Sequence, residues 1–156
     1  MRIIDFHVHV YPDAIARKAA DNVREFYDGI GNNSIDGRVE TLLQRGKQAG
    51  IAEFAILPVA TKPERTRHVN EFIVQQAAAH SEFYGFGTVH ADMEGLMDEV
   101  DFIQHSGLRG IKIHPDYQTF AIDDPRMFPV YEQIQGVMPI VFHMGDLRYD
   151  FSHPAR

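Results

Sequence analysis

Two histidines near the amino terminus have a type and a spacing that suggest metal chemistry. They are His7 and His9, in the apolar, β-branched run 3–10. Side chains alternate along a strand, so Asp5, His7 and His9 share one face. The apolar residues that we expect to be buried on the opposite face are Ile4, Phe6, Val8 and Val10. Two neutral imidazoles on one face form half of a divalent-metal site; the alternative is a solvent-facing pair on an edge strand.

The second group lies in segment 110–115, which reads Gly-Ile-Lys-Ile-His-Pro. A period of two places Lys112 and His114 on one face of a strand. A lysine inside a protein is costly unless it is paired or modified. Three interpretations of Lys112 stay open: a counter-ion for a substrate carboxylate, a carbamylated ligand that bridges two metal ions, or a salt bridge to an inward Asp or Glu. For His114 we expect a hydrogen bond to substrate, or to a metal-binding side chain, rather than direct ligation.

A third histidine, His143, ends the apolar segment 139–142 and precedes a turn that contains glycine. Taken alone, His143 fits a capping or core role equally well. Beside His7 and His9 it completes a three-nitrogen metal site with a free position for water. The nearby Asp146 either orients an imidazole or contacts substrate, or it lies on a loop surface.

One further histidine, His90, directly follows the apolar segment 82–89. Two interpretations of His90 stay open: a structural role, which its position at a strand end favours, and a substrate-binding residue at the mouth of the site. The histidines that we expect to be solvated are His68, His80, His105 and His153.

The composition narrows the classes of partner and metal ligand. The 156 residues carry a formal net charge of −7, which argues against nucleic acid or an anionic membrane as a general partner. There is no cysteine, so thiolate metal sites and disulfides are excluded. No apolar run is long enough for a membrane span, and the amino terminus lacks the pattern of a signal peptide. We therefore expect a cytoplasmic protein with a small-molecule substrate.

Strand and helix patterns alternate along the chain. The expected strands are 3–10, 51–59, 82–89, 108–113 and 137–142. The expected helices are 14–27, 39–48, 68–80, 92–104 (capped by Asp92) and 125–135. This alternation predicts an α/β fold with a parallel sheet. A chemistry-bearing residue follows each strand, as at the mouth of a barrel, and the first turn lacks the glycine-rich loop of a doubly wound sheet. We predict a TIM (β/α)8 barrel, of which this single domain, 1–156, supplies five strands and four crossover helices.

Three motifs together resemble the amidohydrolase superfamily, and more narrowly its amidohydrolase-2 branch. These metal-dependent TIM-barrel hydrolases are related to the nonoxidative aromatic decarboxylases. The motifs are Asp-Phe-His-Val-His at 5–9, Gly-Ile-Lys-Ile-His-Pro at 110–115 and Pro-Ile-Val-Phe-His-Met-Gly at 139–145. Segments 63–70, 85–90 and 116–120 also look like that branch, so the resemblance runs over nearly the whole chain.

The resemblance implies that His7, His9 and His143 bind a divalent metal, usually Zn²⁺ and sometimes Mn²⁺. A metal-activated water would then attack a small organic, carboxylate-bearing substrate. The residues that we expect to act in catalysis are Lys112, His114 and Asp146, and those that we expect to bind substrate are Lys112, His114 and His90. Two alternatives stay open: a nonoxidative decarboxylase or hydratase on the same scaffold, and a non-catalytic remnant that binds metal or oligomerises.

Members of this family continue through three more strands, which bring a further histidine and a metal-binding aspartate. We therefore expect this chain to be a barrel truncated at its carboxyl end, with weak or absent turnover. An arc of five strands leaves open edges and an exposed inner face, which self-association into a homo-oligomer would cover.

Overall fold

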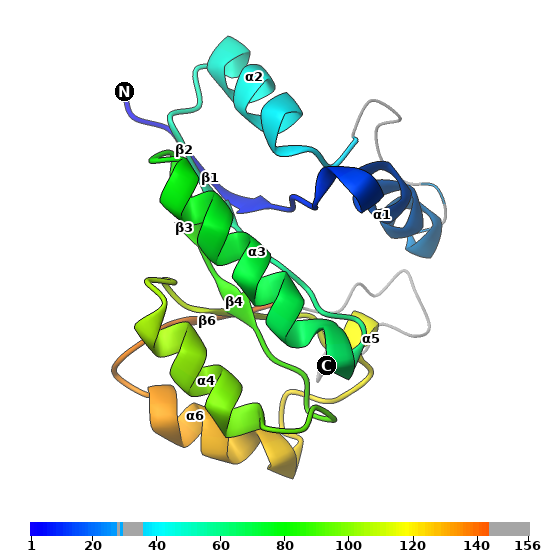
Figure 1. Cartoon of the computed structure of the whole chain (residues 1–156), viewed down its shortest axis with the longest axis vertical. Coiled ribbons are helices and arrows are strands. Elements are labelled where there is room, and N and C mark those ends of the chain that lie inside the picture. Colours follow the sequence, from blue (N-terminus) through cyan, green and yellow to red (C-terminus); the bar gives the residue numbers. More distant parts are fainter. Residues whose placement is uncertain (28, 30–35, 144–156) are drawn as a thin grey trace. The chain divides into compact units, whose positions relative to one another are not determined.

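The computed structural model describes residues 1–27, 29 and 36–143, and it divides into two compact units. Unit 1 is Met1–Ile56, and unit 2 begins at Leu57 (Figure 1). Every strand pairing described below is parallel, as the alternation of strands and helices predicts.

Unit 1 contains two parallel strands and the two helices between them. Its elements are β1 (Ile4–Val8), α1 (Asp13–Phe26), α2 (Val39–Ala49) and β2 (Glu53–Ile56). Both predicted helices are present, and each boundary lies within one residue of the prediction. Helix α2 ends at Gly50, whose φ of 72° lies in the left-handed region that glycine adopts without strain.

The expected burial of the apolar face of β1 is wrong for most of its members. Ile4 and Phe6 are 47% and 57% exposed, and only Val10 is buried. Strand β1 pairs with β2, but the register shifts between Asp5 and Val8. An irregularity of this kind re-aims side chains, so a simple alternation does not hold across the whole strand.

Unit 2 holds the remaining elements. The helices are η1 (Pro63–Arg65), α3 (Thr66–Ala79), α4 (Leu96–His105), α5 (Pro115–Gln118), η2 (Pro125–Met127) and α6 (Phe128–Ile134). The strands are β3 (Phe83–Gly85), β4 (Gly87–Thr88), β5 (Ile111–Ile113) and β6 (Ile140–Phe142). Strands β4, β5 and β6 form one parallel sheet in that order. Helices α4 and α6 lie side by side (Figure 1), joined by hydrogen bonds from Gln133 to Asp101 and Gln104.

The predicted strand 82–89 is divided into two short strands at Phe86. Gly85 and Gly87 lie on the face that the helices cover. A Cβ on Gly85 would meet Ile73 of α3, and one on Gly87 would meet Ile103 of α4. Alternation therefore places Thr88 on the opposite face of the strand.

Gly87→Ala is expected to lower the free energy of unfolding by about 1–2 kcal/mol, because the added methyl overpacks the helix–sheet contact. Its Cβ would lie 2.7 Å from two side-chain atoms of Ile103. Urea denaturation measures the loss. Adding Ile103→Ala in the same chain removes the overlap, so the double variant should lose less than the sum of the single losses. Full additivity would contradict this packing.

Two helix predictions in unit 2 need correction, and one helix was missed. Asp92 does not cap α4, because the helix begins at Leu96 after Gly95, whose φ is 67°. The predicted helix 125–135 is a 3₁₀ turn followed by α6. The short helix α5 was not predicted, although a proline at its first position favours a helix start.

No helix in the described part of the chain is long and apolar enough to cross a membrane.

Candidate functional site

His7 and His9 lie together at the end of β1, as predicted. The centroids of their rings are 5.1 Å apart, and the ring planes meet at 70°. Asp5 shapes this strand end, because its Oδ1 accepts a hydrogen bond of 3.1 Å from the backbone N–H of His7. Two imidazoles at this separation suit a shared divalent ion, whose nitrogen ligands lie about 2 Å away.

Both histidines line a cavity of about 330 Å³ within unit 1. The rest of its wall comes from the loop that starts at Val10, from α1, and from the start of α2. The cationic side chains on the wall are Arg24, Arg38 and Arg45, and the acidic ones are Asp21 and Asp36. Its volume falls in the range of small-molecule sites, about 300–1,000 Å³.

The two carboxylates of this cavity form hydrogen bonds or ion pairs with neighbouring groups of the chain. Asp36 accepts hydrogen bonds from the backbone N–H of Arg38 (3.0 Å) and from the hydroxyl of Thr41 (2.8 Å). The bond from Arg38, and then the other hydrogen bond and the nearby guanidinium groups, lower the pKa of Asp36. Asp21 lies 3.3 Å from a guanidinium nitrogen of Arg24. Three arginines face two carboxylates, so the wall carries one net positive charge when the histidines are neutral.

Tyr11 lines the cavity and keeps its proton. Burial raises the pKa of its hydroxyl to about 12, so the group is a hydrogen-bond donor at neutral pH. Its backbone N–H donates to the carbonyl of Gly37 (2.9 Å), and a Cβ on Gly37 would lie 2.8 Å from the Tyr11 ring.

Lys112 is fully buried in the centre of β5, and its ammonium has no hydrogen-bond partner among the described residues. The salt bridge to an acidic residue, one of the three interpretations of this lysine, is therefore absent from the described part of the chain. Burial lowers the pKa of Lys112 to about 8. The register pairs Lys112 with Thr88 of β4, whose buried hydroxyl likewise has no hydrogen-bond partner among the residues that the structure describes. The two side chains share the face of the sheet opposite the helices.

His114 and His143 meet where β5 and β6 end. Their rings stack with centroids 3.9 Å apart and planes only 8° from parallel. The backbone N–H of His143 donates to the carbonyl of Ile113 (2.9 Å), which continues the ladder of the sheet. His114 also caps α5, because its Nδ1 accepts from the N–H of Tyr117 at 3.4 Å.

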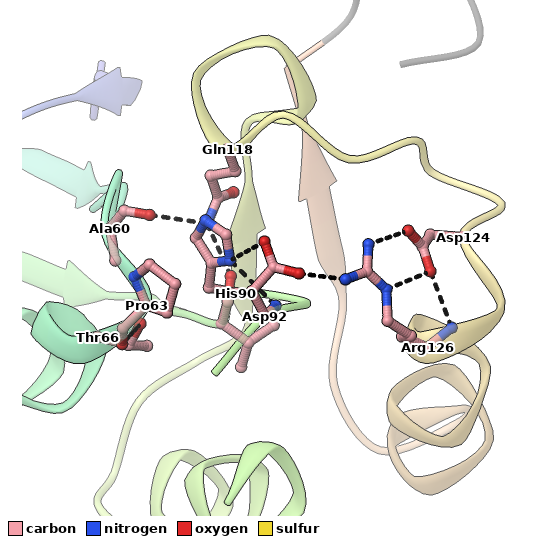
Figure 2. A network of polar contacts seen from close by, with 9 residues as sticks. Ala60, Pro63, Thr66, His90, Asp92, Gln118, Asp124 and Arg126 are labelled. Carbon is pink, nitrogen blue, oxygen red and sulfur yellow. Dashed lines mark hydrogen bonds and ion pairs between the residues drawn. The ribbon is translucent and has the colours of Figure 1, made fainter. Parts of the chain in front are cut away.

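Gln118 joins three segments of unit 2, and its contact with Ala60 is drawn in Figure 2. Its Nε2 donates to the carbonyls of Val89 (2.7 Å) and Ala60 (3.2 Å), and its Oε1 accepts from the N–H of His114 (2.8 Å). The side chain is 1% exposed. We did not single out Gln118 from the sequence, because a lone glutamine carries no spacing signal; its role appears only with the fold.

His90 is 3% exposed and follows β4. Asp92 lies beside it, and Arg126 lies on the far side of Asp92 (Figure 2); neither was predicted to take part in the site. Asp92 was interpreted as a helix cap, whereas its carboxylate in fact pairs with Arg126.

The predicted residues fall into two groups. His7 and His9 lie together in unit 1, and Lys112, His114 and His143 share one sheet in unit 2. Asp146 lies outside the described residues, as do residues 28 and 30–35 of the loop after α1. Within either unit, the described residues hold no group of three or more His, Asp or Glu that could bind an ion. The joint ligation by His7, His9 and His143 therefore stays a prediction.

The chain has a parallel α/β fold like that of a known hydrolase structure of TIM-barrel type. That structure is the crystal structure of a probable 2-pyrone-4,6-dicarboxylic acid hydrolase from Acinetobacter baumannii with citric acid bound. The TM-score is 0.57 at 12% sequence identity, over 93% of this chain and 50% of that one. This chain thus spans about half the length of the solved structure, and the likeness concerns the fold alone. No protein-family model matches the sequence, and no curated protein does.

Proposed function

We propose that this chain is part of a metal-dependent hydrolase of the amidohydrolase superfamily, of the amidohydrolase-2 branch, built on a TIM barrel. The observation that carries the proposal is the pair His7 and His9 on the wall of a cavity of small-molecule size. The likeness to the fold of a dicarboxylic acid hydrolase supports it.

The two imidazoles of His7 and His9 supply part of the ligand set that a divalent ion needs. The two imidazoles lie close enough to share one ion, and nitrogen ligands suit Zn²⁺ or Mn²⁺. In the proposal His143 supplies a third nitrogen. Such an ion would supply Lewis acidity and lower the pKa of a water molecule, which is the usual source of a nucleophile in metal-assisted hydrolysis.

The charges favour an anionic substrate. The cavity beside His7 carries a net positive charge from its arginines, and Lys112 is a buried cation without a partner among the described residues. The structure of similar fold is that of a probable hydrolase of a dicarboxylic acid, and it has citric acid bound. We propose a small carboxylate-bearing ester, lactone or amide as substrate. Lys112, His114 and His90 would bind it, and Asp146 would assist in catalysis by orienting an imidazole.

His7→Ala is expected to remove bound metal. The natively purified wild-type chain should carry about one Zn²⁺ or Mn²⁺, measured by elemental mass spectrometry. The variant should lose it, because alanine has no donor atom to replace the imidazole ligand of His7. The matched control is His105→Ala, since His105 is an exposed histidine on α4 that the proposal does not use. It should keep the metal.

Hydrolysis is then tested with carboxylate-bearing esters and lactones, with carbon dioxide release measured in parallel. Metal-dependent hydrolysis that His7→Ala abolishes supports the proposal. A folded chain without metal would overturn the metal site, and release of carbon dioxide from aromatic acids without hydrolysis would replace the hydrolase by the decarboxylase alternative.

A further inference from the structure

A hydrogen bond within the turn 90–92 determines which ring nitrogen of His90 carries the proton. Its Nδ1 accepts a hydrogen bond of 3.2 Å from the backbone N–H of Asp92. A neutral imidazole that accepts at Nδ1 carries its proton on Nε2, so Nε2 is a donor. Nε2 makes no hydrogen bond to a described residue. The edge of the ring packs against Phe120, with centroids 5.6 Å apart, which fixes its orientation.

A chain of charges leads from His90 to the surface (Figure 2). The carboxylate of Asp92 lies 3.9 Å from Nδ1 of His90 and forms an ion pair with Arg126. Asp124 holds Arg126 in place through two contacts, 2.9 Å to Nε and 2.5 Å to Nη2. The guanidinium is therefore fixed before it meets Asp92, and it offsets the charge of that carboxylate where it faces the histidine.

We propose that Arg126, acting through Asp92, is a positioning residue that keeps His90 a neutral Nε2–H donor for an oxygen atom of a bound carboxylate. The inference rests on the proposed function for the nature of that ligand. The protonation state and its dependence on Arg126 stand on the geometry of unit 2 alone.

The charged groups that act on His90 come from three places. Burial lowers the pKa of His90, and Asp92, which follows β4, opposes this by raising it. Arg126 of η2 lowers the pKa, and Glu64 of η1 raises it. Without Arg126 the carboxylate of Asp92 acts on the ring unopposed, so the pKa of His90 should rise and the ring should become cationic at a higher pH.

The test is an NMR titration of the full chain labelled with ¹⁵N at histidine. Long-range ¹H–¹⁵N correlation reports which nitrogen of His90 carries the proton, and at what pH the ring becomes charged. We expect the Nε2–H tautomer in the wild type. In Arg126→Met the midpoint should rise by about 0.5 pH unit, since an exposed unit charge a few ångströms away acts through a high dielectric. Arg126→Lys keeps the charge and should restore the midpoint.

The control is Arg109→Met, which removes an exposed positive charge elsewhere in unit 2 and should leave the midpoint unchanged. A merely structural role of Arg126 would not move the titration of His90. A Nδ1–H tautomer in the wild type, or equal midpoints in the wild type and Arg126→Met, would overturn the inference.

Acetate serves as the carboxylate probe. It should shift the Nε2–H resonance of His90 saturably in the wild type, and a flat response would overturn the donor role. These readouts need neither turnover nor metal, so they separate the two proposals. A confirmed titration in a folded chain that binds no metal leaves the positioning inference standing and overturns the proposed metal site.

Discussion

Lys112→Met is expected to raise the free energy of unfolding at pH 7 by about 3–4 kcal/mol. Lys112 is fully buried, and its ammonium has no hydrogen-bond partner among the described residues. Desolvation lowers its pKa from 10.5 to about 8, and each unit of pKa corresponds to about 1.4 kcal/mol. Methionine has a similar length and no charge, so it fills the same space without that cost.

The stability gain should depend on pH with a defined sign. Below pH 8 the lysine is protonated in both the folded and the unfolded chain, and the folded chain bears the full cost of the buried charge. Between pH 8 and pH 10.5 the folded chain has released the proton while the unfolded chain still binds it, so the stability of the wild type rises with pH. The gap between Lys112→Met and the wild type should therefore be widest below pH 8 and close by about pH 10.5.

Urea denaturation at pH 7 and at pH 10.5 measures both gaps. The control is Lys62→Met, an exposed lysine before η1 that should change stability little at either pH. A Lys112→Met chain less stable than the wild type at pH 7, or a gap that is the same at both pH values, would show that the ammonium is stabilised after all.

Because the buried ammonium of Lys112 lowers the stability of the fold, we expect it to have a role in binding a ligand. A carboxylate ligand beside Lys112 and the hydroxyl of Thr88 would supply both missing partners at once. Strongly perturbed groups of this kind concentrate at functional sites. The proposed function therefore implies two changes in Lys112→Met: the chain becomes more stable, and it loses substrate binding.

The local pattern around Lys112 could be predicted from the sequence because a strand has a strict period of two. The alternation in 110–115 predicted a strand with Lys112 between two apolar residues, and β5 (Ile111–Ile113) has all three of its residues fully buried. The same argument was weaker at the amino terminus. There a shifted register breaks the alternation of β1, and no composition signal announces such an irregularity.

Side chains that join elements far apart in the sequence could not be predicted. Asp92 precedes a helical pattern, so a cap was the local interpretation, and its partner Arg126 lies 34 positions away. Gln118 likewise bonds to the carbonyl of Ala60, 58 positions earlier. A single sequence contains no information on such pairs until the fold brings them together. The joint position of His7, His9 and His143 is of the same kind, and it stays a prediction.

Asn70 is a further side chain that joins distant elements, through several buried hydrogen bonds. It lies on α3, and the helical spacing of the sequence did not single it out. Its side chain pairs with the backbone of Thr88 twice, accepting from the N–H (2.8 Å) and donating to the carbonyl (2.8 Å). It also donates to Glu99 of α4 (2.7 Å), which is 2% exposed and bound on its other oxygen by Arg67 (2.6 Å). One amide thus joins two helices to the strand that carries Thr88.

Asn70→Ala is expected to lower the free energy of unfolding by about 3–5 kcal/mol, because it leaves two backbone groups and one oxygen of a buried carboxylate without their partner. Urea denaturation at pH 7 measures the loss. The matched control is Gln75→Ala, an exposed amide on the same helix, which should change stability by less than about 0.5 kcal/mol. A loss below about 1 kcal/mol in Asn70→Ala would mean that water or Arg67 replaces the amide. The network would then be a peripheral contact rather than the joint that positions β4 and the residues that follow it.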